Sequence, residues 1–143
     1  MNSIATAVWS GGLKDGKGTL SAAGGAFQSV PYDFRKRFEG SSAPGTTPEE
    51  LIAAAHSGCY AMALSGSLGT AGFTASRISV RATVTLVPVD GKPTVTESHL
   101  EVRAAVPGLD AAKFATLADE TKAGCPISRL LSTKITLDAK LEG

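Results

Sequence analysis

The stretch EELIAAAHSGCYAMALSGSLG (residues 49–69) places a cysteine, Cys59, in the middle of a long apolar segment. Its spacing predicts one long helix, and almost no position on either side of that helix is charged. Such a helix is buried on most sides, and one domain of this size can hardly surround it. We therefore expect a second copy of the chain to cover part of the helix. The positions expected to form its main apolar face are Leu51, Ile52, Ala55, Cys59, Met62, Ala63 and Leu68.

The residues around this stretch predict where the helix begins and ends. Thr46 or Thr47 can cap the N-terminus, and Pro48 suits the first helical position. Glu49 and Glu50 would complement the positive end of the helix dipole. A glycine at position 69 or 72 is expected to end the helix.

The remainder of the chain predicts an α+β fold in which antiparallel sheets pack around this long central helix and a second helix. Asp15-Gly16 and Asp90-Gly91 are typical of hairpin turns between strands. Residues 33–47 are charged and then rich in Ser, Pro, Gly and Thr, which predicts a long loop. The order is βββ-α-ββ-α-β, so a parallel doubly wound sheet is not expected. The expected strands are 4–10, 18–23, 26–32, 77–89, 93–106 and 133–143, and the later helices are 110–124 and a short one at 125–132.

Length and charge limit the classes of function. A chain of 143 residues predicts a single domain over residues 1–143. A net charge of +1 gives no long-range field, so no nucleic-acid partner is expected, and the run Arg35, Lys36, Arg37 is too short to suggest one. The sequence has no uninterrupted apolar run of about 20 residues, so no membrane span is expected. The N-terminus does not resemble a signal peptide, so we expect a cytoplasmic protein.

The two cysteines, Cys59 and Cys125, are the candidates for chemistry. In a reducing compartment they are not expected to form a merely structural disulfide. A helical cysteine such as Cys59 is most simply a small buried hydrophobe. Cys125 precedes Pro126, so it can cap a helix, where backbone N–H groups favour the thiolate.

A metal site is the weakest alternative. His56 and Cys59 lie three residues apart on one helix face, and Cys125 and His99 would complete four ligands. No close-spaced second pair supports such a site, so no metal is expected. His99 alternates with Glu97 and Glu101 on a predicted strand and is expected to share their solvent-facing side.

Taken together, several segments resemble the OsmC/Ohr family of osmotically inducible and organic hydroperoxide resistance proteins, with wording closer to the OsmC branch. The resemblance covers essentially the whole chain in order. It rests on RFEG (residues 37–40), TPEELIAAAHSGCYAMALS (47–65), AGFT (71–74), VPGLDAAKF (106–114), KAGCPIS (122–128) and ITLDAKL (135–141).

The resemblance implies thiol-dependent reduction of organic hydroperoxides, and less certainly of hydrogen peroxide, without any cofactor. It implies that Cys59 is the peroxidatic thiol and Cys125 the resolving one, with Arg37 and Glu49 completing the site. An external dithiol, such as a lipoyl protein, would reduce the resulting Cys59–Cys125 disulfide. The family also implies an intertwined homodimer.

Position adds two constraints to these roles. In mid-helix Cys59 receives no help from its own helix dipole, and burial raises a thiol pKa, so a guanidinium is expected to stabilise the thiolate. Arg37 is the matching residue, held by Glu49, although the neighbouring Arg35 could be the functional cation instead. Ten residues separate Glu49 from Cys59, about 15 Å along a helix and roughly 80° around it. Either Arg37 spans part of that gap, or Glu49 acts from the partner chain.

One alternative belongs to a different class of function. The chain could be a non-catalytic dimeric module that binds a hydrophobic ligand between its long helices. Both cysteines would then be inert packing residues.

Overall fold

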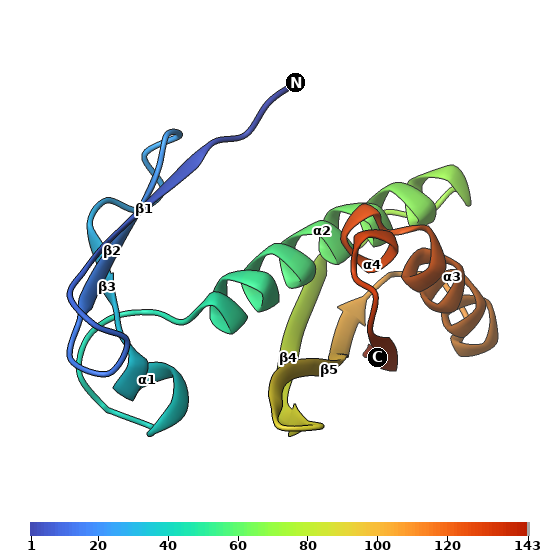
Figure 1. Cartoon of the computed structure of the whole chain (residues 1–143). Helices are drawn as coiled ribbons and strands as arrows, with labels where there is room; N and C mark the ends of the chain where they lie inside the picture. The colour runs from blue at the N-terminus through green and yellow to red at the C-terminus, as the bar shows by residue number, and fades with distance from the viewer. Residues whose placement is uncertain (143) are drawn as a thin grey trace. The chain divides into compact units, whose positions relative to one another are not determined.

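The computed structural model describes residues 1–142 and comprises two compact units, Met1–Leu51 and Ile52–Gly143. The fold is α+β, as the sequence predicts, and each of its two sheets has three strands. Figure 1 shows the helices and strands along the chain. Two short helices, α1 and α4, add to the two longer ones. The elements in chain order are β1 (Ala5–Ser10), β2 (Lys17–Ala22), β3 (Val30–Tyr32), α1 (Phe34–Phe38), α2 (Pro48–Thr70), β4 (Arg77–Val89), β5 (Lys92–Ala105), α3 (Ala111–Gly124), α4 (Pro126–Leu130) and β6 (Lys134–Glu142).

The first unit contains an antiparallel sheet in the order β1-β2-β3. The Trp9 and Tyr32 rings lie 5.4 Å apart on this sheet. Asp15 and Gly16 do not form a two-residue turn, because β1 already ends at Ser10 and the connection spans residues 11–16. The Gly16 N–H closes that connection by donating to the Gly12 carbonyl oxygen at 2.8 Å.

The prediction of an uninterrupted loop over residues 33–47 is wrong, because α1 occupies its first part. Asp33 caps this helix by accepting the Lys36 N–H at 2.8 Å. Burial of apolar side chains does not explain why α1 forms, because none of its residues is buried. A side-chain cap and ring contact between Phe34 and Phe38, with centroids 4.9 Å apart, stabilise this single turn.

The start of α2 agrees with the sequence. Thr47 and Glu50 form a reciprocal capping box: the Thr47 Oγ1 accepts the Glu50 N–H, and a Glu50 carboxylate oxygen accepts the Thr47 N–H, both at 3.1 Å. Pro48 occupies the first helical position, where its missing N–H costs nothing. The helix then continues without a break to Thr70.

The second unit contains the sheet β4-β5-β6. The hairpin between β4 and β5 turns at Asp90 and Gly91, whose φ angles of 50° and 74° are those of the predicted two-residue turn. β6 pairs with β5 in parallel, which corrects the expectation of purely antiparallel sheets. The reason is the crossover through α3 and α4, which returns the chain to the starting end of β5.

The core of the second unit lies between α2, α3 and one face of this sheet. From α2 come Tyr60, Leu64 and Leu68, which are fully buried and recur every four residues. They pack with Phe114 of α3 and with alternate residues of β5, namely Leu100, Val102 and Ala104. Asp110 caps α3 as predicted, accepting the Lys113 N–H at 2.9 Å.

Helix α2 is buried along one stripe only. Met62, expected on the main apolar face, is 79% exposed, and Ala55 is exposed as well. The helix has the length and the apolar composition of a membrane span, features that the core helices of soluble proteins share. The exposure of Met62 and Ala55 shows that the helix leaves an apolar side uncovered in the second unit.

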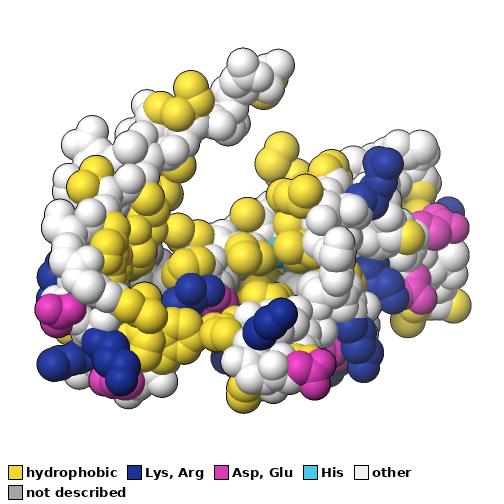
Figure 2. Space-filling model, viewed as in Figure 1, with side chains coloured by type: hydrophobic (Ala, Val, Ile, Leu, Met, Phe, Trp, Pro, Cys, Tyr) yellow, Lys and Arg dark blue, Asp and Glu magenta, His cyan; other side chains and the backbone are white. Residues whose placement is uncertain are grey.

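Hydrophobic side chains also gather on the surface of the first unit (Figure 2). Val8 is 58% exposed and Ile4 and Leu13 even more so, although β1 is a well-formed strand. All six residues of β1 are exposed. A strand whose residues are all exposed gains little from burial within its own unit.

Candidate functional site

The two cysteines meet in the second unit. Their Sγ atoms lie 3.3 Å apart, within hydrogen-bond range for sulfur, although 66 positions separate the residues. Both are free thiols; Cys125 is fully buried, whereas Cys59 is partly exposed. Helix α2 carries Cys59, and the junction between α3 and α4 carries Cys125. The pair therefore has one accessible sulfur and one buried sulfur.

Cys125 is the N-cap residue of α4, with Pro126 at the first helical position, as predicted. Burial by itself would raise the pKa of Cys125, but the backbone N–H of Ser128 opposes this effect and outweighs it together with further donors. These donors are the Cys59 thiol, the Ser128 hydroxyl and the Ile127 N–H. The pKa of Cys125 is consequently held below its ordinary value, so this sulfur is the better place for a negative charge.

The pKa of Cys59 moves the other way. Burial raises it, and the charge that Cys125 can carry raises it further. The backbone N–H of Ile127 at the start of α4 opposes these effects. The sequence excludes help only from the dipole of the helix that carries Cys59, and the N–H of Ile127 belongs to a different helix.

A buried histidine lies three residues before Cys59 on the same helix. His56 is fully buried on α2, and its Nδ1 and Nε2 lie 2.7 Å from the Ser98 Oγ and 2.8 Å from the Ser128 Oγ. Burial lowers the pKa of His56, so the ring is neutral at neutral pH. Sequence reasoning considers His56 only as a metal ligand and passes over Ser98 and Ser128. The available signal was Ser128 three residues after the N-cap, where a polar side chain commonly reaches back to the cap.

Arg37 and Glu49 form an ion pair within the first unit. The Arg37 Nη2 lies 2.7 Å from the Glu49 Oε1, and the Arg37 Nε lies 3.1 and 3.2 Å from the two carboxylate oxygens. α1 positions the arginine, and the first turn of α2 positions the glutamate, whose side chain is only 12% exposed. The Arg37 guanidinium also lies 5.1 Å from the centre of the Phe38 ring.

The neighbouring cations have other environments. Lys36 donates to the Ala43 carbonyl oxygen at 3.0 Å, and Arg35 is exposed. Only Arg37 of the three basic residues pairs with Glu49 among the described contacts. This geometry favours Arg37 over Arg35 as the cation that Glu49 holds.

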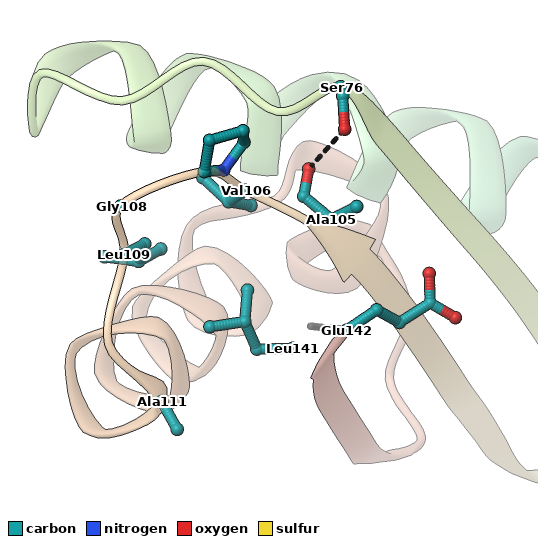
Figure 3. Close-up of a pocket in the computed structure, with 9 residues that line it drawn as sticks. Ser76, Ala105, Val106, Gly108, Leu109, Ala111, Leu141 and Glu142 are labelled. Atoms are coloured by element: carbon teal, nitrogen blue, oxygen red, sulfur yellow. Dashed lines mark hydrogen bonds between the residues drawn. The ribbon is translucent and has the colours of Figure 1, made fainter.

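No other feature of the described residues offers comparable chemistry. A pocket of about 520 Å³ in the second unit lies between the end of β5 and the start of α3, lined mainly by apolar side chains such as Val106, Leu109 and Leu141 (Figure 3). Its Ser76 hydroxyl donates to the Ala105 carbonyl oxygen at 3.1 Å and so is already engaged. Neither cysteine lines this pocket.

The metal site that the sequence makes the weakest alternative would join His56, Cys59, Cys125 and His99. Among residues 1–142, no group of three or more His, Cys, Asp or Glu side chains could hold a metal ion. His99 is half-buried on β5, on the same side as Glu97, and its Nδ1 lies 2.6 Å from the Thr136 Oγ1. It takes no part in the contacts around the cysteines.

The structure is that of an α+β protein in which two cysteines lie in contact, and comparison of the sequence shows its family. Residues 39–140 match the family model for OsmC-like proteins, so the chain belongs to the OsmC family. The resemblance found in the sequence motifs is thereby confirmed.

Individual relatives agree with this placement. The chain is 48% identical over 134 residues to peroxiredoxin OsmC of Escherichia coli (strain K12), covering 94% of this chain and 92% of that protein. It is 31% identical over 107 residues to the organic hydroperoxide resistance protein of Xanthomonas axonopodis pv. citri (strain 306), covering 71% and 69%. The crystal structure of an OsmC-like protein from Mycoplasma pneumoniae superposes with a TM-score of 0.77 at 18% identity, covering 100% of this chain and 99% of that one. The last comparison supports the fold alone.

Proposed function

We propose that this protein is a thiol peroxidase that reduces organic hydroperoxides to alcohols through a Cys59–Cys125 redox pair. The observation that carries the proposal is the 3.3 Å separation of one accessible and one buried sulfur. The names of the relatives, a peroxiredoxin and an organic hydroperoxide resistance protein, support the same class of activity. Hydrogen peroxide is a further substrate on this proposal, but the apolar surroundings of the thiols favour organic peroxides.

In the first step the Cys59 sulfur attacks the terminal oxygen of the hydroperoxide. Only Cys59 is accessible, although Cys125 has the lower pKa, so the proton that the two sulfurs share must move to Cys125 before attack. The O–O bond then breaks, Cys59 becomes a sulfenic acid, and the alkoxide takes a proton to leave as the alcohol. The lowered pKa of Cys125 makes its thiolate readily available for the next step.

In the second step the Cys125 thiolate attacks the sulfur of the Cys59 sulfenic acid. A disulfide forms between the two cysteines, and hydroxide leaves. An external dithiol reduces this disulfide by two successive exchanges and is itself oxidised to a cyclic disulfide. A lipoyl protein matches this chemical class. Such a reductant suits the predicted cytoplasmic location, where thiols are kept reduced.

Arg37 and Glu49 complete the proposed site. A guanidinium near the reacting sulfur favours the thiolate and stabilises the negative charge that develops on the departing oxygen. Glu49 fixes the direction of that guanidinium through the two-pronged contact described above. The same pairing reduces the pull of Arg37 on the thiolate, so Glu49 exchanges some charge stabilisation for positioning.

A dose of organic hydroperoxide tests the proposal against the alternative of a ligand-binding module. One equivalent of cumene hydroperoxide per chain is expected to consume both thiols and to yield one equivalent of alcohol. A module whose cysteines are packing residues would keep both thiols and leave the peroxide intact. Titration of free thiols beside quantification of the alcohol distinguishes the two outcomes.

We further propose a homodimer in which the partner covers the open side of α2 and the exposed sheet of the first unit. The exposure of Met62 and Val8 supports this proposal, because a monomeric protein rarely exposes many large apolar side chains to solvent. Met62→Arg is expected to shift the chain from dimer towards monomer in analytical ultracentrifugation. Thr116→Arg, on an exposed position of α3, serves as the control and should leave the dimer intact. A wild-type monomer at micromolar concentration would contradict the proposal.

A further inference from the structure

Among the described residues, two side-chain hydrogen bonds join α2 to α3, and the steps proposed so far do not use them. The Tyr60 hydroxyl donates to the Ala118 carbonyl oxygen at 2.8 Å, and the Ser67 Oγ lies 3.0 Å from the Thr121 Oγ1. Tyr60 is fully buried, so water does not compete for its hydroxyl. Burial also raises the pKa of Tyr60 far above neutrality, so the hydroxyl stays protonated and remains a donor.

Both bonds lie on the side of α3 that leads to Cys125. The buried residues of α3 are Phe114, Ala118 and Thr121, and Cys125 continues this alternation of four and three positions. Seven residues separate Ala118 from Cys125, so at about 100° per residue they lie within about 20° of each other around the helix. The Cys125 N–H donates to the Thr121 carbonyl oxygen at 2.8 Å, which attaches the cysteine to the last turn of α3. A movement of α3 on α2 therefore also moves the Cys125 sulfur.

On α2, the tyrosine bond is the one that lies beside the accessible sulfur. Tyr60 directly follows Cys59, whereas Ser67 lies eight residues after it, about 12 Å along the helix axis. Without the Tyr60 hydroxyl, the remaining hydrogen bond between the two helices would lie at that distance from the cysteine. The end of α3 that carries Cys125 could then rock on α2.

We propose that Tyr60 is a positioning residue for the redox pair: by holding α3 on α2, it keeps the Cys125 sulfur within reach of the Cys59 sulfur while both are thiols. A disulfide bond is about 2.05 Å long, so two sulfurs that lie 3.3 Å apart need to approach by only about 1.3 Å. Groups held this close react as if at very high concentration, and a misplacement of about 1 Å can slow a reaction about a hundredfold.

The hydrogen bond is expected to favour the disulfide over the two thiols. With Tyr60 in place, the dithiol form already has α3 ordered on α2, so forming the disulfide requires little further ordering. Without the hydroxyl, α3 can move in the dithiol form, and closing the disulfide must restrict that movement. The disulfide is therefore less stable relative to the two thiols, and its reduction potential becomes less negative.

This positioning has a consequence in the catalytic cycle, and here the inference rests on the proposed function. A Cys125 sulfur held close to Cys59 shortens the life of the Cys59 sulfenic acid. Excess peroxide would otherwise oxidise that sulfenic acid further, to a sulfinic acid that thiols do not reduce.

A purely structural hydrogen bond would give a different result. If Tyr60 only stabilised the core, loss of its hydroxyl would lower the free energy of unfolding equally in the dithiol and disulfide forms. The reduction potential would then stay unchanged, because it depends only on the difference between the two forms. The potential therefore reports positioning separately from stability.

The test equilibrates the protein with mixtures of reduced and oxidised dithiothreitol, and mass spectrometry after acid quenching and alkylation gives the fraction of disulfide. Two electrons and two protons pass between the protein thiols and the cyclic disulfide of dithiothreitol. Tyr60→Phe keeps the ring and removes only the hydroxyl. Its equilibrium constant for disulfide formation is expected to fall by roughly threefold to tenfold, the effect of one lost hydrogen bond. For a two-electron couple this is a rise in potential of about 14 to 30 mV.

Tyr32→Phe is the matched control, because Tyr32 is the other tyrosine of the chain and lies against Trp9 in the first unit. Its potential should equal that of the wild type. A wild-type potential in a folded Tyr60→Phe variant would overturn the inference, and so would an equal shift in Tyr32→Phe. If Tyr60→Phe does not fold, Ser67→Ala takes its place, since it removes the other hydrogen bond between α2 and α3. A wild-type potential in that variant would then overturn the inference.

The measurement uses no peroxide, so the inference and the proposed function fail separately. A shifted potential in a protein without peroxidase activity would refute the proposed function and leave the positioning role of Tyr60 standing. Peroxidase activity with an unchanged potential in Tyr60→Phe would do the reverse.

Discussion

Cys59→Ser is expected to reduce organic hydroperoxide turnover to the uncatalysed background. A serine hydroxyl is not ionised at neutral pH and is a far weaker nucleophile than a thiolate, so no other described group can take over the attack. Cys125 remains in this variant, with its lowered pKa, but its sulfur is fully buried. The measurement is the loss of cumene hydroperoxide with excess dithiothreitol present.

Cys125→Ser is the matched variant for this prediction. It keeps the accessible thiol, so one equivalent of peroxide should still be consumed, with Cys59 left as a sulfenic acid that dimedone traps. Substantial turnover in Cys59→Ser, together with no first oxidation in Cys125→Ser, would show that the two roles are reversed. This control is needed because the lowered pKa of Cys125 favours a negative charge on its sulfur before any peroxide is added.

Arg37→Met is expected to lower turnover by about a hundredfold, the scale on which a group that stabilises developing negative charge contributes. The substitution removes the charge and roughly preserves the volume of the side-chain stem. Folding should suffer less than chemistry, because a partly exposed ion pair such as Arg37–Glu49 contributes little to stability. Steady-state kinetics with cumene hydroperoxide, beside a thermal unfolding curve, gives both quantities.

The pH dependence of Cys59 alkylation separates the two roles of the cation. On a Cys125→Ser background, Arg37→Met should move the alkylation profile to higher pH, because a thiolate without its cation is harder to form. The loss of turnover should exceed this shift, since the departing oxygen loses its partner too. Arg35→Met is the control, and an effect there rather than in Arg37→Met would reassign the functional cation by two residues. No effect in either variant would leave backbone N–H groups such as that of Ile127 as the whole explanation of reactivity.

Sequence patterns predict the long helix well because its signals are local. The Thr47 cap, Pro48 and the absence of charge along residues 51–68 each act within a few positions, and the structure has the helix where these signals place it. The β4–β5 hairpin is predictable for the same reason, since Asp90-Gly91 determines its own turn. The direction of β6 was not predictable, because it depends on how α3 and α4 cross the sheet rather than on any residue of the strand.

The side of α2 that is buried was harder to predict from the sequence than the position of the helix. Ala55 and Met62 are apolar, and helical spacing assigns them to the same face as Cys59, but within the chain they are exposed. The stripe that packs on the sheet instead includes His56 and Tyr60, two residues whose polar atoms need partners. The polar atoms of these two residues find hydrogen-bond partners in Ser98, Ser128 and a carbonyl of α3. Because these partners come from distant parts of the chain, the pattern of apolar residues along α2 does not indicate that this stripe is buried.

The cysteine pair itself could be anticipated only through the family resemblance. Nothing in the spacing of Cys59 and Cys125 shows that they meet, and each alone is explained by packing or capping. Their shared proton and the way in which the donors of α4 act on both sulfurs are properties of the folded unit. These donors lower the pKa of the buried sulfur, which agrees with the N-cap position that the sequence predicts for Cys125.

The central claim is that Cys59 and Cys125 of one chain form the redox couple, and non-reducing peptide mapping after a single equivalent of cumene hydroperoxide tests it most directly. Mass spectrometry of the digest should find the peptides containing Cys59 and Cys125 joined by a disulfide. The undigested protein should retain the mass of one chain under denaturing conditions, lowered by two hydrogens. Two chains joined through cysteine, or a Cys59 oxidised beyond sulfenic acid while Cys125 stays a free thiol, would contradict the account.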